Sequence, residues 1–202
     1  MKEIEGINLT ITSPAIYDVV IQGSDAILFN KMPDMSQAKT KGPKQQQVDR
    51  LEDEKANFRE KAYLTSDNKV YIPSENMHES LCQGAQYWGQ KIPGAGSKTF
   101  TDVVKSACVV EDVDLGATKD DLIAFGKAVN GTPTKKNPSK VYKVRPLLRP
   151  WAGRFRIHVF DARIDASILK TIVAYAGAYR GVCEWRPKFG RFEVISVTEV
   201  TK

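Results

Sequence analysis

The sequence has no long hydrophobic run. Its 202 residues nowhere approach the roughly 18 consecutive apolar residues that a membrane-spanning helix needs. The first ten residues, MKEIEGINLT, mix charged and apolar side chains and lack the apolar centre of a secretory signal peptide. We therefore expect a cytoplasmic protein, and the length suits a single domain over residues 1–202 that carries insertions.

Cysteine and histidine are scarce, and neither is spaced for metal binding. The three cysteines form no CxxC pair, and the two histidines have no His or Cys partner at ligand spacing. We expect buried, inert thiols at Cys82, Cys108 and Cys183. The sequence also lacks GxSxG and HExxH motifs, and residues 94–99, GAGSKT, resemble a phosphate-binding loop only superficially. No cofactor and no metal ion are expected.

Acidic residues are absent from residues 122–160. This stretch carries nine positive charges, on Lys127, Lys135, Lys136, Lys140, Lys143, Arg145, Arg149, Arg154 and Arg156. Unopposed charges repel one another unless they are solvated or paired with an anion. The stretch, together with a net charge of +6, therefore favours a polyanionic partner, with a solvated basic loop as the alternative.

Hydrophobic spacing predicts the order of the main elements. Strands are expected at 16–22, 103–110, 154–159 and 192–200, with helices at 74–88 and 165–179. In the first helix, Gly84 predicts a close approach by a neighbouring element, and Asp165 is expected to cap the second helix. Residues 31–69 and 111–150 interrupt this order and are interpreted as inserted elements.

Without the insertions, the order is βαββαβ. We therefore predict an α+β fold with a ferredoxin-like, RRM-like core, in which two helices cover one face of an antiparallel sheet. Long inserted finger or thumb elements would project from it. The strand at 154–159 alternates apolar residues with Arg154, Arg156 and His158, which predicts a basic outer face on the sheet.

The loop before the last strand has an unusual composition. Residues 180–194, RGVCEWRPKFGRFEV, combine basic, aromatic and glycine residues. Basic side chains neutralise phosphates and aromatic rings stack on exposed bases, so this composition is typical of single-stranded nucleic-acid binding. Gly181 and Gly190 would let the backbone approach a ligand closely. The alternative is that the aromatic residues close the core, which we expect of Phe192, whereas Trp185 fits either role.

The chain resembles the RAMP superfamily, the proteins that form the backbone of CRISPR effector complexes. The resemblance rests on the strand order, on VYIPSENMHESLCQGA at the first helix and on the glycine- and arginine-rich loop. It is closer still to a group of small phage proteins that share VRPLLRPW and a terminal WRPKFGRFEV, which would place the protein in the bacterial host cytoplasm. The loop departs from the strict GxGxxxxxGxG pattern of the superfamily.

The resemblance implies binding of single-stranded RNA or DNA along the subunit, often with head-to-tail self-assembly into filaments, and other subunits of a nucleoprotein complex as partners. Arg186, Lys188 and Arg191 match the basic places of the family loop. The full set of expected nucleic-acid-binding residues is Lys39, Lys41, Lys44, Lys135, Lys136, Lys140, Lys143, Arg145, Arg154, Arg156, His158, Arg180, Trp185, Arg186, Lys188 and Arg191.

Two other functions stay open at this point. Some RAMP proteins cut RNA. If this chain does the same, it would be a metal-independent endoribonuclease that uses His78 or Asp34. The chain would instead be an interaction module if it docked on a host nucleoprotein complex without binding nucleic acid. The residues favour binding over catalysis, so we predict a protein that is not an enzyme and that oligomerises along its strand.

Overall fold

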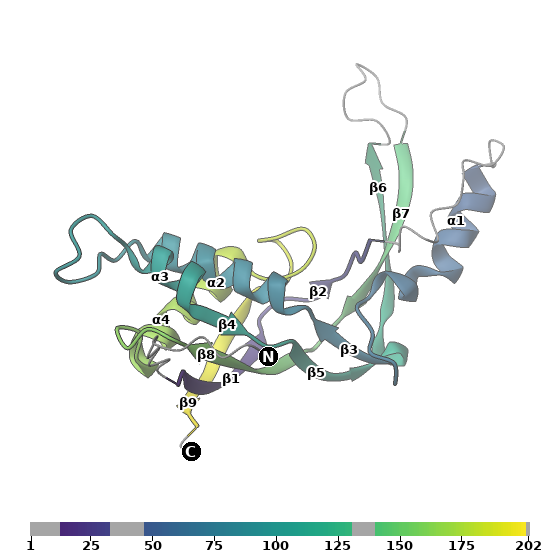
Figure 1. The fold of residues 1–202 in the computed structure, drawn as a ribbon. Coiled ribbons are helices and arrows are strands. Elements are labelled where there is room, and N and C mark those ends of the chain that lie inside the picture. The colour runs from purple at the N-terminus through teal and green to yellow at the C-terminus, as the bar shows by residue number, and fades with distance from the viewer. Residues whose placement is uncertain (1–12, 33–46, 131–139, 201–202) are drawn as a thin grey trace, which may run out of the picture.

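The computed structural model describes residues 13–32, 47–130 and 140–200, and they form a mixed α+β fold with two antiparallel sheets. Figure 1 shows a larger body of sheet and helices, from which a two-stranded arm extends. The predicted class, α+β with antiparallel sheets, is confirmed. None of the helices in these three ranges is long and apolar enough to cross a membrane.

The main sheet forms the base of the body. Its strands follow the order β3 (Lys69–Ile72), β5 (Val113–Thr118), β8 (Ala152–Val159), β1 (Ala15–Gly23) and β9 (Phe192–Glu199), and every pairing is antiparallel. A short strand, β4 (Cys108–Val110), also pairs with β8, beyond the end of β5. Strands β1 and β8 lie inside the sheet, and buried residues alternate with more exposed ones along both of them.

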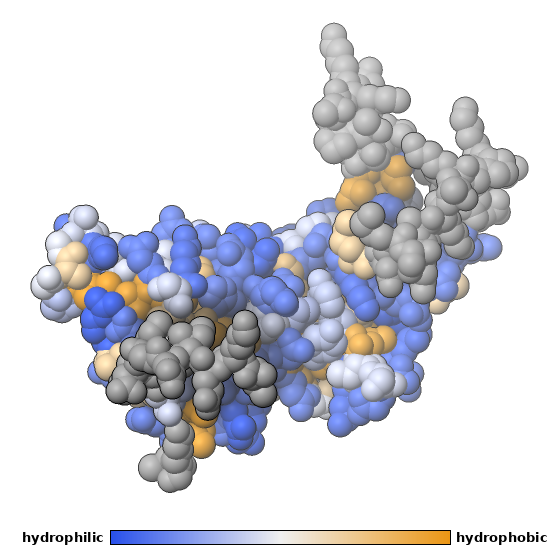
Figure 2. Space-filling view, in the orientation of Figure 1, coloured by the Kyte–Doolittle hydropathy of each residue, from blue (hydrophilic) through white to orange (hydrophobic). Residues whose placement is uncertain are grey.

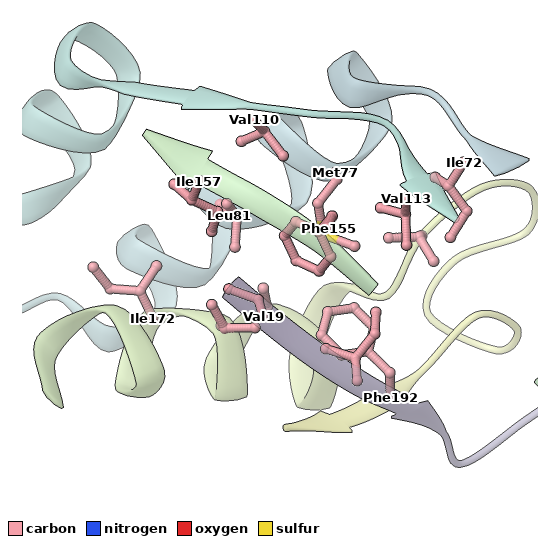
Figure 3. Close-up of a cluster of buried hydrophobic side chains, with 14 of the residues drawn as sticks. Val19, Ile72, Met77, Leu81, Val110, Val113, Phe155, Ile157, Ile172 and Phe192 are labelled. Atoms are coloured by element: carbon pink, nitrogen blue, oxygen red, sulfur yellow. The ribbon is translucent and has the colours of Figure 1, made fainter. Parts of the chain in front are cut away.

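Helices cover one face of this sheet and enclose the core. Met77 and Leu81 of α2 (Ser74–Trp88) and Ile172 of α4 (Ala166–Tyr175) meet Val19 and Phe155 of the sheet, as Figure 3 shows. The last strand contributes Phe192, which is 2% exposed, so its predicted core role is confirmed.

Two local predictions about these helices are also confirmed. A Cβ atom on Gly84 would lie 2.6 Å from the Ala176 nitrogen and from the Ile172 oxygen, so only glycine permits this approach of α2 to the C-terminal end of α4. The Asp165 side chain caps α4 by accepting a hydrogen bond of 2.8 Å from the Ile168 amide.

The strand predicted at 103–110 is wrong over most of its length. Residues Phe100–Ala107 form a helix, α3, and only Cys108–Val110 are extended. Phe100, Val103 and Val104 are buried at the i, i+3 and i+4 positions of this helix, so burial of a helical face outweighs the β-propensity of valine.

The second sheet builds the arm. Strands β6 (Ile123–Asn130) and β7 (Lys140–Leu148) form a hairpin, and β2 (Ile27–Leu28) pairs with the base of β7. Helix α1 (Gln47–Ala56) and the short turns η2 (Phe58–Lys61) and η3 (Lys119–Asp121) complete the elements near it. The predicted insertion at 111–150 therefore includes β5 of the main sheet as well as the arm.

A carboxylate clamp holds α1 beside the free edge of β7. The Val144 amide donates a 3.0 Å hydrogen bond to Glu54, and the Val144 carbonyl accepts one of 3.0 Å from Lys61. Glu54 also pairs with Lys61 and with Lys143, the latter at 3.3 Å. Burial alone would raise the pKa of Glu54, but the Lys61 and Val144 hydrogen bonds and the two lysine charges lower it on balance.

Candidate nucleic-acid interface

The loop of residues 180–191 is anchored to the helical layer. A π-helical segment, η4 (Ala176–Arg180), extends α4 and ends where the Gly181 amide donates a 2.8 Å hydrogen bond to the Ala176 carbonyl. The buried Ser80 hydroxyl of α2 donates a 2.9 Å hydrogen bond to the Gly181 carbonyl. Both contacts fix the start of the loop, and with it the direction in which Arg180 leaves the helix.

The two glycines of the loop are required by the loop itself. Gly181 and Gly190 have φ values of 71° and 75°, in the left-handed region. A Cβ atom on Gly190 would lie 2.1 Å from the Val182 oxygen, and one on Gly181 would lie 2.8 Å from the Gly190 oxygen. Close packing of one backbone segment of the loop against another therefore explains both glycines. The expected close approach of a ligand is not needed to account for them.

The far end of the loop packs on the base of the arm. The Glu184 and Gly190 amides donate hydrogen bonds of 3.0 and 2.9 Å to the carbonyls of Leu28 and Ala26. Phe125 of β6 lies edge-on to Trp185 and Phe189, with ring centroids 6.1 and 5.5 Å away. These three half-buried rings belong to a small hydrophobic cluster that is separate from the main core.

A lysine of the arm covers this aromatic cluster. Lys127 Nζ lies 4.9 Å from the centroid of the Trp185 ring, a cation–π contact between the arm and the loop. Figure 2 shows a hydrophobic patch on the arm, in a view that is otherwise mostly hydrophilic. Cation and aromatic ring therefore lie side by side where the arm meets the loop. Lys127 belongs to the acid-free stretch, whereas nothing in the sequence singled out Phe125.

Three arginines around the loop bury N–H groups that have no partner. Within the described residues, Arg145 Nε, Arg180 Nε and Arg186 Nη1 are buried and make no hydrogen bond. Burial lowers the pKa of Arg186, and the charge of Arg180 lowers it further. Within the described part of the chain, the ion pair of Arg145 is with a distant carboxylate, Glu184 Oε1 at 4.0 Å. Unpaired, positively charged donors of this kind are suited to an anion such as a phosphate.

The basic face of the main sheet is partly neutralised by the chain itself. Arg154, Arg156 and His158 point away from the helices, as predicted, because they alternate with buried residues of β8. Asp18 on β1 accepts hydrogen bonds from Arg154 at 2.8 Å and Arg156 at 3.1 Å, which lower its pKa. His158 Nε2 lies 2.8 Å from a Glu111 oxygen. The sequence alone did not connect these acidic residues with the basic strand.

The predicted residues thus fall on two surfaces. Arg145, Arg180, Trp185 and Arg186 meet at the loop and the arm base, whereas Arg154, Arg156 and His158 lie on the sheet face opposite the helices. Lys188 and Arg191 are exposed on the loop, Lys140 is exposed on β7, and Lys143 is paired with Glu54. The remaining predicted residues lie outside the described ranges: Lys39, Lys41, Lys44, Lys135 and Lys136, as does Asp34.

His78 lies on the side of α2 that faces β4. It is half-buried, its Nδ1 atom is 3.8 Å from the Cys82 sulfur, and it lines a groove of about 300 Å³ with Glu75 and Glu79. The described residues contain no cluster of three metal-ligand side chains. Cys108 is buried, and burial raises its pKa to about 12, as expected of an inert thiol.

No protein-family model matches the chain, and no curated protein matches it. Among solved structures, it is similar to a chain described as "Type III-B Cmr-beta bound to cognate target RNA", at 13% sequence identity and a TM-score of 0.54. That match covers 94% of this chain and 61% of the other, so this chain spans about three fifths of its neighbour's length. Cmr6 from Pyrococcus furiosus is also similar, at 10% identity and a TM-score of 0.48, with 92% and 99% of the two chains covered. Across 94% of its length, the chain therefore shares the fold of the Cmr-beta chain.

Proposed function

We propose that the chain binds single-stranded nucleic acid, without catalysis, at the 180–191 loop and the base of the β6–β7 arm. The observation that carries the proposal is the set of buried, unpaired N–H groups on Arg145, Arg180 and Arg186. Leaving a buried charged donor without a partner costs free energy. These atoms are covered by the protein, so the arginine side chains would turn outward for a phosphate to supply the missing acceptors.

The aromatic cluster beside the arginines supplies the second part of a binding site. Trp185 and Phe189 are half-buried, so each keeps part of its ring accessible next to Arg186 in the same loop. Bases of an unpaired strand can stack on such rings while its phosphates contact the cations, and neither contact requires a particular base sequence. The proposed ligand is therefore an unpaired strand rather than a duplex.

RNA is the favoured strand. The Cmr-beta neighbour, whose fold this chain shares, is described as bound to cognate target RNA. By analogy of fold, we propose a RAMP-like subunit with a βαββαβ core formed by β1, α2, β4, β8, α4 and β9. Cytoplasmic location, head-to-tail self-association and partnership with other subunits belong to the same proposal, as does the grouping with small phage proteins.

The test measures binding of a labelled single-stranded RNA to the whole chain at several salt concentrations. The double variant Arg180→Gln and Arg186→Gln removes two charges at similar side-chain volume, and Lys105→Ala removes an exposed charge on α3 as the matched control. We expect weaker binding for the double variant, and a slope of log K against log salt that is flatter by about 0.7 for each lost contact. An unchanged slope, or no binding by the wild type at low salt, would refute the proposal.

The same preparation separates the rival functions. Incubation with labelled RNA and EDTA should leave the RNA intact. A defined product that disappears in His78→Ala would instead establish the endoribonuclease. A chain that binds no oligonucleotide yet captures a protein complex would be the interaction module.

A further inference from the structure

Three tyrosines stack on the helical face, outside the core. Tyr179 of η4 lies 5.5 Å from Tyr87 of α2 and 5.5 Å from Tyr175 of α4, measured between ring centroids, with interplanar angles of 27° and 22°. Tyr87 is 53% exposed and Tyr179 is 55% exposed. None of the three is among the residues of the main core cluster or those packed against it. Core packing therefore does not account for the stack.

The stack adjoins the cationic loop. Arg180 directly follows Tyr179, and its Nε is one of the buried N–H groups without a partner. The loop touches α2 at Ser80, and Tyr87 follows seven residues later, about 10 Å further along the helix. A strand that crosses Arg186 and Arg180 would therefore reach the tyrosines within the length of a few nucleotides.

The exposed residues next to the rings in sequence are uncharged. The exposed neighbours in sequence are Gln86 on α2 and Ala174 and Ala178 on the α4–η4 segment, so no acidic side chain among them would repel a phosphate backbone. Flat rings with short or neutral neighbours, next to an arginine whose Nε lacks an acceptor, suit a nucleobase on the ring and a phosphate on the cation.

We propose that Tyr87 and Tyr179 form a stacking platform for a base of the strand whose backbone is held by Arg180. This inference rests on the proposed function and extends its binding site from the loop onto the helical face. The platform reads no particular base, because every base has a face that can stack on a tyrosine ring.

The experiment compares Tyr87→Leu and Tyr179→Leu with Phe160→Leu, which removes a ring that is 50% exposed on the turn after β8. Binding is measured with two ligands, a single-stranded RNA and a strand of the same length made of abasic units. Each tyrosine variant should bind the RNA at least about five-fold more weakly than the wild type. The abasic strand should bind the wild type and all variants alike, and Phe160→Leu should bind both ligands like the wild type.

Cross-linking of the unmodified chain provides a readout that does not depend on how a variant folds. A strand that carries 5-iodouracil should yield cross-linked peptides containing Tyr87 or Tyr179 after irradiation. Cross-links confined to other aromatic residues, or equal RNA affinity of wild type and tyrosine variants, would overturn the platform and leave the proposed function standing. A wild type that binds neither ligand at low salt would overturn both.

Discussion

Lys127 Nζ lies 4.9 Å from the centroid of the Trp185 ring, so a lysine of the arm covers an aromatic residue of the loop. The contact joins two segments that are 58 residues apart in the sequence. The ring also supports the arm base through its edge-on contact with Phe125. Binding of a base by the rest of the ring is part of the proposed function.

Replacing Trp185 with alanine should weaken RNA binding without unfolding the domain. Loss of one stacking ring is worth about 1–3 kcal/mol of binding free energy. The main core should stay intact because Trp185 packs in the separate cluster with Phe125 and Phe189. Titration with labelled RNA and a thermal unfolding curve measure the two effects. Collapse of the cooperative transition would show that the residue is structural.

Gly84→Ala should destabilise the protein by about 1–3 kcal/mol, because its Cβ would overlap backbone atoms at 2.6 Å on the neighbouring helical segment. Gly126→Ala is the matched control: a Cβ there meets nothing within 4 Å, on an exposed strand of the arm. Urea unfolding of both variants gives the comparison. Equal stabilities would contradict the close packing of α2 against α4 and η4.

Asp18→Asn should remove an acid-dependent part of the stability. Hydrogen bonds from Arg154 and Arg156 lower the pKa of Asp18, so the carboxylate stabilises the fold above its unfolded pKa of about 3.9. That contribution is lost as the pH falls through the lower, folded pKa. Urea unfolding should therefore show a difference between wild type and variant at pH 6 that shrinks toward pH 3. A difference that does not change with pH would argue against the ion pairs.

Glu54→Ala should loosen α1 from the arm. The Val144 amide would lose its acceptor, and Lys61 and Lys143 would lose their shared carboxylate. We expect faster hydrogen exchange at the Val144 amide and a loss of about 1–2 kcal/mol in stability. Glu52→Ala, an exposed position on the same helix, should leave both unchanged. Protection of Val144 that survives in Glu54→Ala would contradict the clamp.

Local signals predicted the body of the fold well. The alternation in β8 and the Asp165 cap each depend on residues close in sequence. The tight site at Gly84 follows from one steric rule, that a glycine inside a helix marks a place where a side chain would clash. Helix α3 was missed because its valines favour strands when considered alone, and only tertiary burial makes Phe100 and Val104 a helical face.

The site was harder to predict because its contacts are long-range. The residues that neutralise the sheet face, Asp18 and Glu111, lie 136 and 47 residues from their partners, Arg154 and His158. No pattern in one sequence connects them. The loop composition singled out Arg180, Trp185 and Arg186 as candidates, but the contact of Trp185 with Phe125 depends on how the loop packs against the arm.

The alternation of basic and buried residues along β8 bears on how long an oligomer must be to reach both basic surfaces. Arg154 and Arg156 face outward from the sheet, whereas Arg180 and Arg186 belong to a loop that is fastened to the helices on the other side. A single oligomer that occupies both surfaces must therefore bend around the rim of the body, so very short oligomers should fill one surface at a time.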